Sequence, residues 1–259
     1  DTPGLKFLCR ESFDDNRSHF DHPLGSRFEE MDAVVFFDDV LVPWERVFLL
    51  GNPELCNNYS SNTHALAHTG HQVVSRTVVK TEFMLGLLSM MVDTLGSGEI
   101  PHVQERMGDV INFLQTLRAC VRAAEADAQI DDWGVMCPAR EPLVAARNMF
   151  AKTIYPRLAE IVQQMGSSSL MALPAEADFD TPIAAEMEKY FSTETASARE
   201  RTKLFHLAWD VACSAFAGRQ VLYERFFGGD PVRNAILLYE NYDKEPAMQR
   251  IRDFLERTD

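Results

Sequence analysis

The sequence predicts an α+β fold in which a short β segment precedes a bundle of long helices. The first 50 residues hold brief runs of β-branched and aromatic residues between turn signals, as in antiparallel strands. From residue 54 onward, apolar residues recur at three- and four-residue steps, which is the period of an α-helix. The change falls at Gly51-Asn52-Pro53. We therefore expect two units with segregated layers, residues 1–52 and residues 53–259.

Three strands are predicted in the amino-terminal unit. Leu5–Cys9 is a short apolar run, and Asp32–Phe37 is rich in β-branched and aromatic residues. Asp38-Asp39 make a turn into a further strand at Val40–Pro43, which the proline ends because it has no N–H for the ladder. The polar stretch Glu11–Ser26 is typical of a loop. Because the chain opens on a turn without a methionine, we expect this unit to be the end of a larger antiparallel β domain in a longer protein.

Helices are predicted over most of the second unit, and local signals mark their ends. Three long ones are expected at Val73–Met91, closed by Gly96-Ser97-Gly98, at Val103–Ala128, opened by Pro101, and at Pro142–Met165, broken near Pro156. Another helix is expected to begin at the capping box Ser197/Glu200 and to run into the stretch Trp209–Pro231. Shorter helices are expected at Ile183–Phe191, Val232–Tyr239 and Pro246–Glu256. Helices of about 25 residues are about 37 Å long, and bundles of that length often pair across subunits. We therefore expect a homo-oligomer.

Charge and cysteine spacing restrict the partners and the compartment. The net charge of −14 and the pI of about 4.9 disfavour nucleic acid and anionic membranes as partners. No apolar run approaches ~18 residues and no signal peptide opens the chain, so neither a membrane span nor secretion is predicted. The five cysteines are widely spaced and never form a C-x-x-C pair, as expected for free thiols in the cytoplasm.

The stretch Trp209–Pro231 contains the clearest candidate site. Its window Ser214-Ala215-Phe216-Ala217-Gly218 sets small residues around one aromatic ring, so a flat, bulky group could lie close to both backbone and ring. Arg219 follows, with a rigid fork of donors that suits a phosphate. Helix packing alone would use the same small residues. The residues by themselves therefore leave both interpretations open.

Two other clusters have a weaker claim to chemistry. His64, His68 and His71 would share one helix face and could form a metal triad, but no carboxylate or cysteine lies nearby on that face, so no metal is predicted. Gly166-Ser167-Ser168-Ser169 could bind a phosphate or ribose through N–H and hydroxyl groups, or could simply end a helix. The sequence contains no G-x-G-x-x-G, P-loop, G-x-S-x-G or H-E-x-x-H motif.

Three longer motifs give the chain a family resemblance. They read D-H-P-L-G-S-R-F-E-E-M-D-A at residues 21–33, D-V-L-V-P-W-E at 39–45, and S-A-F-A-G-R with L-Y-E at 214–219 and 222–224. With them, the chain resembles the oxygenase component of two-component, reduced-FAD-dependent 4-hydroxyphenylacetate 3-monooxygenases. The resemblance covers essentially the whole chain. It implies an acyl-CoA dehydrogenase-like fold, of which this chain is the end of the middle β domain and the carboxy-terminal four-helix bundle that builds a tetramer.

The resemblance also implies a chemistry. A separate flavin reductase supplies reduced FAD, O₂ adds to flavin C4a to give a hydroperoxide, and the distal oxygen goes to the carbon ortho to the hydroxyl of a 4-hydroxyphenylacetate-like phenol. In that family the groups that hold the phenol lie upstream, so no catalytic residue is expected in this segment. We expect a full-length protein of this kind to hydroxylate a para-substituted phenol, and this segment alone to be inactive.

The same resemblance assigns FAD contacts to Ser214, Ala215, Phe216, Ala217 and Arg219, with Arg76 as a further candidate for the phosphate. Ala217 stands where glycine is frequent in the family, and its methyl group is tolerable unless the backbone needs a positive φ. Two alternatives are a non-catalytic oligomerisation module that forms one wall of a flavin site, and an acyl-CoA dehydrogenase- or dehydratase-like enzyme. The related dehydratases bind an iron–sulfur cluster through a histidine and a cysteine, and the helix that carries His64, His68 and His71 has no such cysteine.

Overall fold

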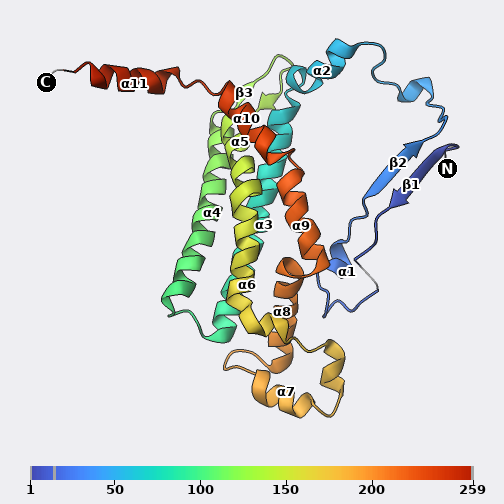
Figure 1. Cartoon of the computed structure of the whole chain (residues 1–259), viewed down its shortest axis with the longest axis vertical. Helices are drawn as coiled ribbons and strands as arrows, with labels where there is room; N and C mark the ends of the chain where they lie inside the picture. The colour runs from blue at the N-terminus through green and yellow to red at the C-terminus, as the bar shows by residue number, and fades with distance from the viewer. Residues whose placement is uncertain (1, 14–15, 258–259) are drawn as a thin grey trace.

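Long helices that run side by side make up most of the structure, a computed structural model that describes residues 2–13 and 16–257 (Figure 1). The long axis is followed by α3 (Ala65–Leu95), α4 (Pro101–Ala126), α5 (Arg140–Met149) with α6 (Tyr155–Met171), and α8 (Ala198–Ala212) with α9 (Ala215–Phe226). Shorter helices are α1 (Gly25–Phe28), α2 (Pro53–Asn62), α7 (Ala184–Phe191), α10 (Pro231–Asn241) and α11 (Glu245–Leu255). The mostly helical architecture predicted from the apolar period is confirmed.

Large apolar side chains from the long helices fill the space between them. The largest fully buried ones include Met84, Leu88, Leu117, Phe150, Tyr155, Leu158 and Phe205. They recur at helical spacing, so each helix presents one broad apolar face to the centre. None of the helices in the described part of the chain combines the length and the hydropathy that a bilayer crossing requires.

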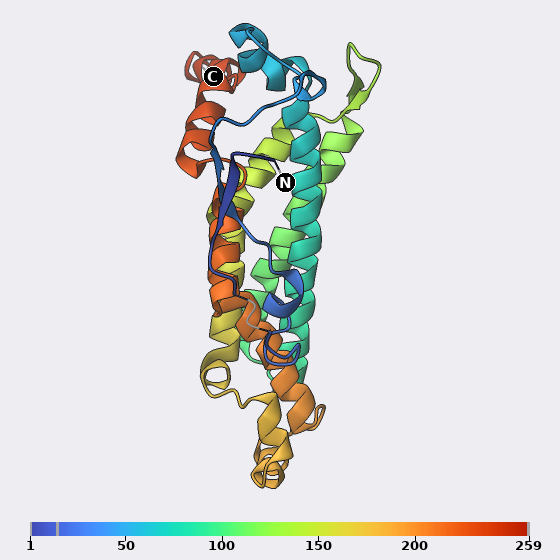
Figure 2. The same cartoon turned by 90° about the vertical axis from the view of Figure 1, so that its right-hand side faces the viewer.

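A β hairpin lies alongside this bundle (Figure 2). Strands β1 (Leu5–Cys9) and β2 (Ala33–Phe37) pair antiparallel, with Phe7 opposite Val35. The predicted third strand at Val40–Pro43 is wrong: these residues have no regular structure and lead into a 3₁₀ turn at Trp44–Arg46. No neighbouring strand among the described residues offers them a ladder to join. The larger middle β domain stays a prediction.

The helix ends follow the local signals closely. Gly96 ends α3 with a left-handed backbone at φ 59°, as predicted. Pro101 opens α4, and the capping box Ser197/Glu200 opens α8, also as predicted. The expected break near Pro156 is a π-helical turn at Phe150–Ile154, where the widened backbone accommodates a residue that lacks an N–H. A second hairpin, β3 (Gln129–Ile130) with β4 (Met136–Cys137), joins α4 to α5.

Candidate functional site

A cavity of about 580 Å³ opens between α1, α3, α8 and α9. Apolar side chains form most of its lining: Leu24, Phe28, Val79, Phe83, Met84, Val211 and Phe216. The polar lining residues are Arg76, Lys80, Tyr155 and Gln220. A volume and a lining of this kind are usual for small-molecule sites, and a mostly apolar wall with a few polar groups suits a flat ring system. We call this cavity the α9 pocket.

The break between α8 and α9 places Phe216 in the wall of the α9 pocket. The Ser214 side chain caps α9: its Oγ accepts from the Ala217 N–H at 3.1 Å and donates to the Asp210 carbonyl at 3.0 Å. Because this fixes the first turn of α9, the Phe216 ring, 6% exposed, lies against the cavity. The sequence predicted one helix running from Ser197/Glu200 into Trp209–Pro231, whereas α8 ends at Ala212, just before the small-residue window. It did not reveal that the window begins a new helix.

Asp210 holds the opposite wall in place, although no motif in the sequence singles it out. Its side chain is 1% exposed, and Oδ2 accepts from the backbone N–H groups of Leu24 at 2.6 Å and Gly25 at 2.8 Å. These charge-assisted bonds fasten the start of α1 to the bundle, so that Leu24 and Phe28 close the pocket. The one local signal is an acid on an otherwise apolar stretch of α8, between Trp209 and Val211.

Three charged side chains form the polar end of the α9 pocket. Glu224 is 4% exposed and accepts from Arg76 in a bidentate pair, Nη1–Oε1 at 2.6 Å and Nη2–Oε2 at 2.8 Å. Lys80 Nζ lies 2.5 Å from Glu224 Oε1. Two cations share one carboxylate, so this triad carries a net positive charge. The triad therefore favours an anionic ligand group in the adjoining pocket.

Burial and the carboxylate act in opposite directions on the two cations. Burial lowers the pKa of Lys80, and Glu224 offsets only part of that effect. Burial also acts to lower the pKa of Arg76, but the hydrogen bonds and the charge of Glu224 outweigh it and raise that pKa. Lys80 Nζ also lies 5.1 Å from the ring centre of Tyr155, whose buried hydroxyl has a raised pKa. Tyr155 is therefore a neutral hydroxyl at the edge of the pocket.

The five predicted contacts lie in different surroundings. Phe216 lines the α9 pocket, Ser214 is half-buried as the cap, and Ala215 is exposed. Ala217 is 1% exposed in the first turn of α9 and does not have a positive φ, so its methyl group is not strained. The N–H groups of Ala215 and Phe216 also lie in this first turn, where no carbonyl of the same helix can accept them.

Arg219 contacts the β hairpin instead of the pocket lining. Its Nε lies 3.0 Å from Asp32 Oδ2 and its Nη2 lies 3.1 Å from Asp32 Oδ1, and Arg10 binds the same carboxylate. Hydrogen bonds from Arg219 and then Arg10 lower the pKa of Asp32. Arg219 Nη1 is buried without a hydrogen-bond partner among the described residues. Arg219 does not line the α9 pocket, and its phosphate contact stays a prediction.

The other predicted clusters are not assembled as the sequence suggested. His64 has a left-handed backbone at φ 51° before α3 begins, so it does not continue the helix face of His68 and His71. His71 Nε2 lies 3.0 Å from Glu125 Oε1. At Gly166–Ser169 the helical backbone is interrupted, as the helix-end alternative expects: Ser167 has φ 45° and ψ −132°, and α6 (Tyr155–Met171) consists of two helical stretches that meet there at a kink. Within residues 2–13 and 16–257 no three metal-ligating side chains converge.

Comparison with known proteins identifies the relatives of this chain. A family model described as "4-hydroxyphenylacetate 3-hydroxylase C terminal" matches residues 56–256, and one described as "4-hydroxyphenylacetate 3-hydroxylase N terminal" matches residues 1–49. A 4-hydroxyphenylacetate 3-monooxygenase oxygenase component from Thermus thermophilus is 49% identical over 257 residues. That alignment covers 99% of this chain and 53% of the relative, so the chain spans about half the length of such relatives.

Solved structures agree with this placement. The oxygenase component of a 4-hydroxyphenylacetate 3-monooxygenase, in complex with FAD and 4-hydroxyphenylacetate, superposes with a TM-score of 0.93 at 49% identity, over 98% of this chain and 53% of that one. An archaeal 4-hydroxybutyryl-CoA dehydratase superposes with a TM-score of 0.84 at 16% identity, over 100% of this chain and 52% of that one. The second likeness concerns the fold alone and supports the expected acyl-CoA dehydrogenase-like architecture.

Proposed function

Since the chain belongs to the 4-hydroxyphenylacetate 3-hydroxylase family, we propose that it is the FAD-binding wall of the oxygenase component of a two-component flavin monooxygenase. The proposed reaction hydroxylates a phenol of the 4-hydroxyphenylacetate type at the carbon ortho to its hydroxyl group. Reduced FAD comes from a separate flavin reductase, and O₂ is the co-substrate. This chain works together with the remaining half that its relatives carry, which holds the phenol.

The observation that carries the proposal is the α9 pocket. Its 580 Å³ volume, its apolar walls and the Phe216 ring fit one flat ring system. The net positive triad of Arg76, Lys80 and Glu224 stands at one end, where an anionic reduced flavin or a cofactor phosphate would be stabilised. The N–H groups of Ala215 and Phe216 donate to no described residue, so they offer a second place for an anionic oxygen, at a helix amino terminus.

Bound reduced FAD supplies the activation of O₂ and the oxygen transfer. The residues of this chain would bind and orient the flavin and exclude water from the site. Phe216 would contact the flavin ring, Leu24 and Phe28 would close the pocket over it, and the apolar lining would keep out water that would divert the reaction. Ser214 and Asp210 keep the two walls at their spacing through the hydrogen bonds they form. Arg219 holds the hairpin against α9 through its hydrogen bonds to Asp32.

The proposed protein is a homotetramer in the cytoplasm. All five cysteines are free thiols, as expected in a reducing compartment. The mostly helical bundle presents long faces through which subunits can pair. Neither a nucleic acid nor a membrane is a proposed partner, since the net charge of −14 repels both polyanions and anionic lipids.

A turnover experiment tests the proposal. The test uses a protein of the full length seen in the relatives, in which this chain is joined to the other half. It is mixed with reduced FAD, O₂ and 4-hydroxyphenylacetate, and the products are separated by chromatography. We expect the corresponding catechol from this protein and none from residues 1–259 alone. Hydrogen peroxide without any catechol, from every phenol offered to the longer protein, would contradict the proposed hydroxylation.

A further inference from the structure

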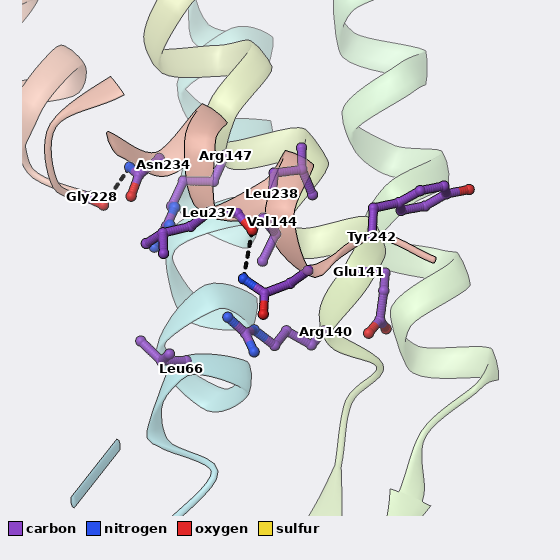
Figure 3. Close-up of a pocket in the computed structure, with 11 residues that line it drawn as sticks. Leu66, Arg140, Glu141, Val144, Arg147, Gly228, Asn234, Leu237, Leu238 and Tyr242 are labelled. Carbon is purple, nitrogen blue, oxygen red and sulfur yellow. Dashed lines mark hydrogen bonds between the residues drawn. The ribbon is translucent and has the colours of Figure 1, made fainter. Parts of the chain in front are cut away.

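A second pocket, of about 300 Å³, lies near the other end of α9, between α5 and α10 (Figure 3). On one side it is lined by Arg140, Val144 and Arg147 of α5, and on the other by Leu237 and Leu238 of α10. The proposed flavin site does not use it. We call it the α5–α10 pocket.

Its two arginines have no counter-ion among the described residues. Arg140 and Arg147 are seven positions apart, which puts them on one face of α5. Neither forms a hydrogen bond or an ion pair with a described residue, and Arg147 Nε is buried without a partner. Glu141 is the one carboxylate in the lining, and it makes no ion pair with either arginine. A half-buried guanidinium without a counter-ion, such as that of Arg147, is unfavourable, and the exposed Arg140 adds a second positive charge on the same face, so this end of the pocket favours an anion.

The local backbone is shaped around Arg147. Gly228 lies so close that a Cβ atom there would be 2.9 Å from Arg147 Cδ and 3.2 Å from its Nε. Asn234 Nδ2 donates to the Gly228 carbonyl at 2.9 Å, which holds this turn against the start of α10 (Figure 3). The stem of Arg147, up to Nε, therefore packs closely against the backbone of Gly228. Burial and the neighbouring Arg140 charge both lower the pKa of Arg147, as expected for a cation without a partner.

We propose that the α5–α10 pocket binds a phosphate monoester that carries an apolar or aromatic body. Guanidinium groups bind phosphate oxygens in bidentate fashion. A phosphate monoester carries about −1.5 to −2 charges near neutral pH, which matches two arginines better than a single carboxylate does. The pocket is larger than one phosphate group needs, and Leu237, Leu238 and Tyr242 provide an apolar surface beside the arginines for the rest of the ligand.

Calorimetric titration with inorganic phosphate and phenyl phosphate tests this site, and it needs neither FAD nor turnover. Phenyl phosphate is expected to bind one-to-one and more tightly than inorganic phosphate. Arg147→Gln should weaken phenyl phosphate by at least about tenfold, because one charged hydrogen-bond pair is lost. Arg122→Gln is the matched control: Arg122 lies on α4 with its side chain 82% exposed, and binding should not change.

Thermal unfolding shows whether a loss of binding in Arg147→Gln comes from a folding defect. Without phosphate, Arg147→Gln should melt at or above the temperature of the parent, since an unpaired charge is removed. Phenyl phosphate should raise the melting temperature of the parent and leave that of Arg147→Gln unchanged. The absence of binding to the parent would overturn the proposal, as would unchanged binding in Arg147→Gln. Equal affinity for phenyl phosphate and inorganic phosphate would overturn the assigned ligand class.

Discussion

Removing the charge of Glu224 is the perturbation whose effect the structure defines best. Glu224→Gln keeps the shape of the side chain but leaves Arg76 and Lys80 facing each other without a carboxylate. Removing one partner of a buried ion pair destabilises a protein by about 3–5 kcal/mol. The Arg76 and Lys80 side chains are 32% and 26% exposed, so water can relieve part of the repulsion. We therefore expect the lower end of that range, about 3 kcal/mol.

A loss of this size is easily measured. For a chain of this length it corresponds to a fall in melting temperature of roughly 6–12 °C, and it can be followed by circular dichroism during thermal or urea unfolding. Glu82→Gln is the control, since Glu82 pairs with Arg118 at the surface with its side chain 41% exposed. That change should alter the free energy of unfolding by about 0–1 kcal/mol. If the two variants lost equal stability, the triad would not be the buried electrostatic centre described here.

Two further predictions concern the contacts that hold the amino-terminal segment to the bundle. Asp210→Asn should loosen Leu24 and Gly25 and speed hydrogen exchange at α1, at a cost of about 1–3 kcal/mol for the weakened charged bonds; the exposed Asp109→Asn serves as its control, and equal exchange in both would contradict the role of Asp210. Arg219 and Arg10 lower the folded-state pKa of Asp32. The stability that Asp32 contributes to the folded state is therefore fully present above the ordinary carboxyl pKa of about 4, and it is lost as the pH falls through the lower, folded value. Protease cleavage in the hairpin should therefore increase as the pH falls below about 4 in the parent, whereas Asp32→Asn should be cleaved readily at neutral pH too; a parent with no such pH dependence would show that Asp32 does not hold the hairpin.

Local signals in the sequence predicted the helices well. The apolar period located the helices, and Gly96, Pro101 and the Ser197/Glu200 box marked ends that depend on only a few neighbouring residues. The prediction of a strand at Val40–Pro43 was wrong. Unlike a helix end, a strand depends on a pairing partner elsewhere in the chain, and its own residues do not specify that partner. The sequence indicated the break at Ser214 only in part, because a small-residue window can either end one helix or cap the next. In the structure the Ser214 side chain accepts from the Ala217 N–H, which makes Ser214 the cap of α9.

The site depended on pairs that are far apart in the sequence. Asp210 binds backbone N–H groups 185 and 186 residues away, and Glu224 binds Arg76 across 148 residues. No periodicity or motif in either segment specifies such a partner. Phe216 and Arg76 were nevertheless predicted, through the family resemblance, and the structure places both in the lining of one cavity. Arg219 was chosen by the same argument, and its main partner is Asp32.

The most direct test of the account is an anaerobic titration with reduced FAD of Ser214→Trp, in a protein that includes the remaining half found in the relatives. A tryptophan at this position fills the approach to Phe216, so we expect the dissociation constant to rise by at least about tenfold. Ser197→Trp is the matched control, because Ser197 caps α8 as Ser214 caps α9 and each change loses a cap contribution of about 1 kcal/mol. The account predicts equal melting temperatures for the two variants and weakened flavin binding only in Ser214→Trp. Unchanged affinity for reduced FAD in Ser214→Trp would contradict the placement of flavin against α9.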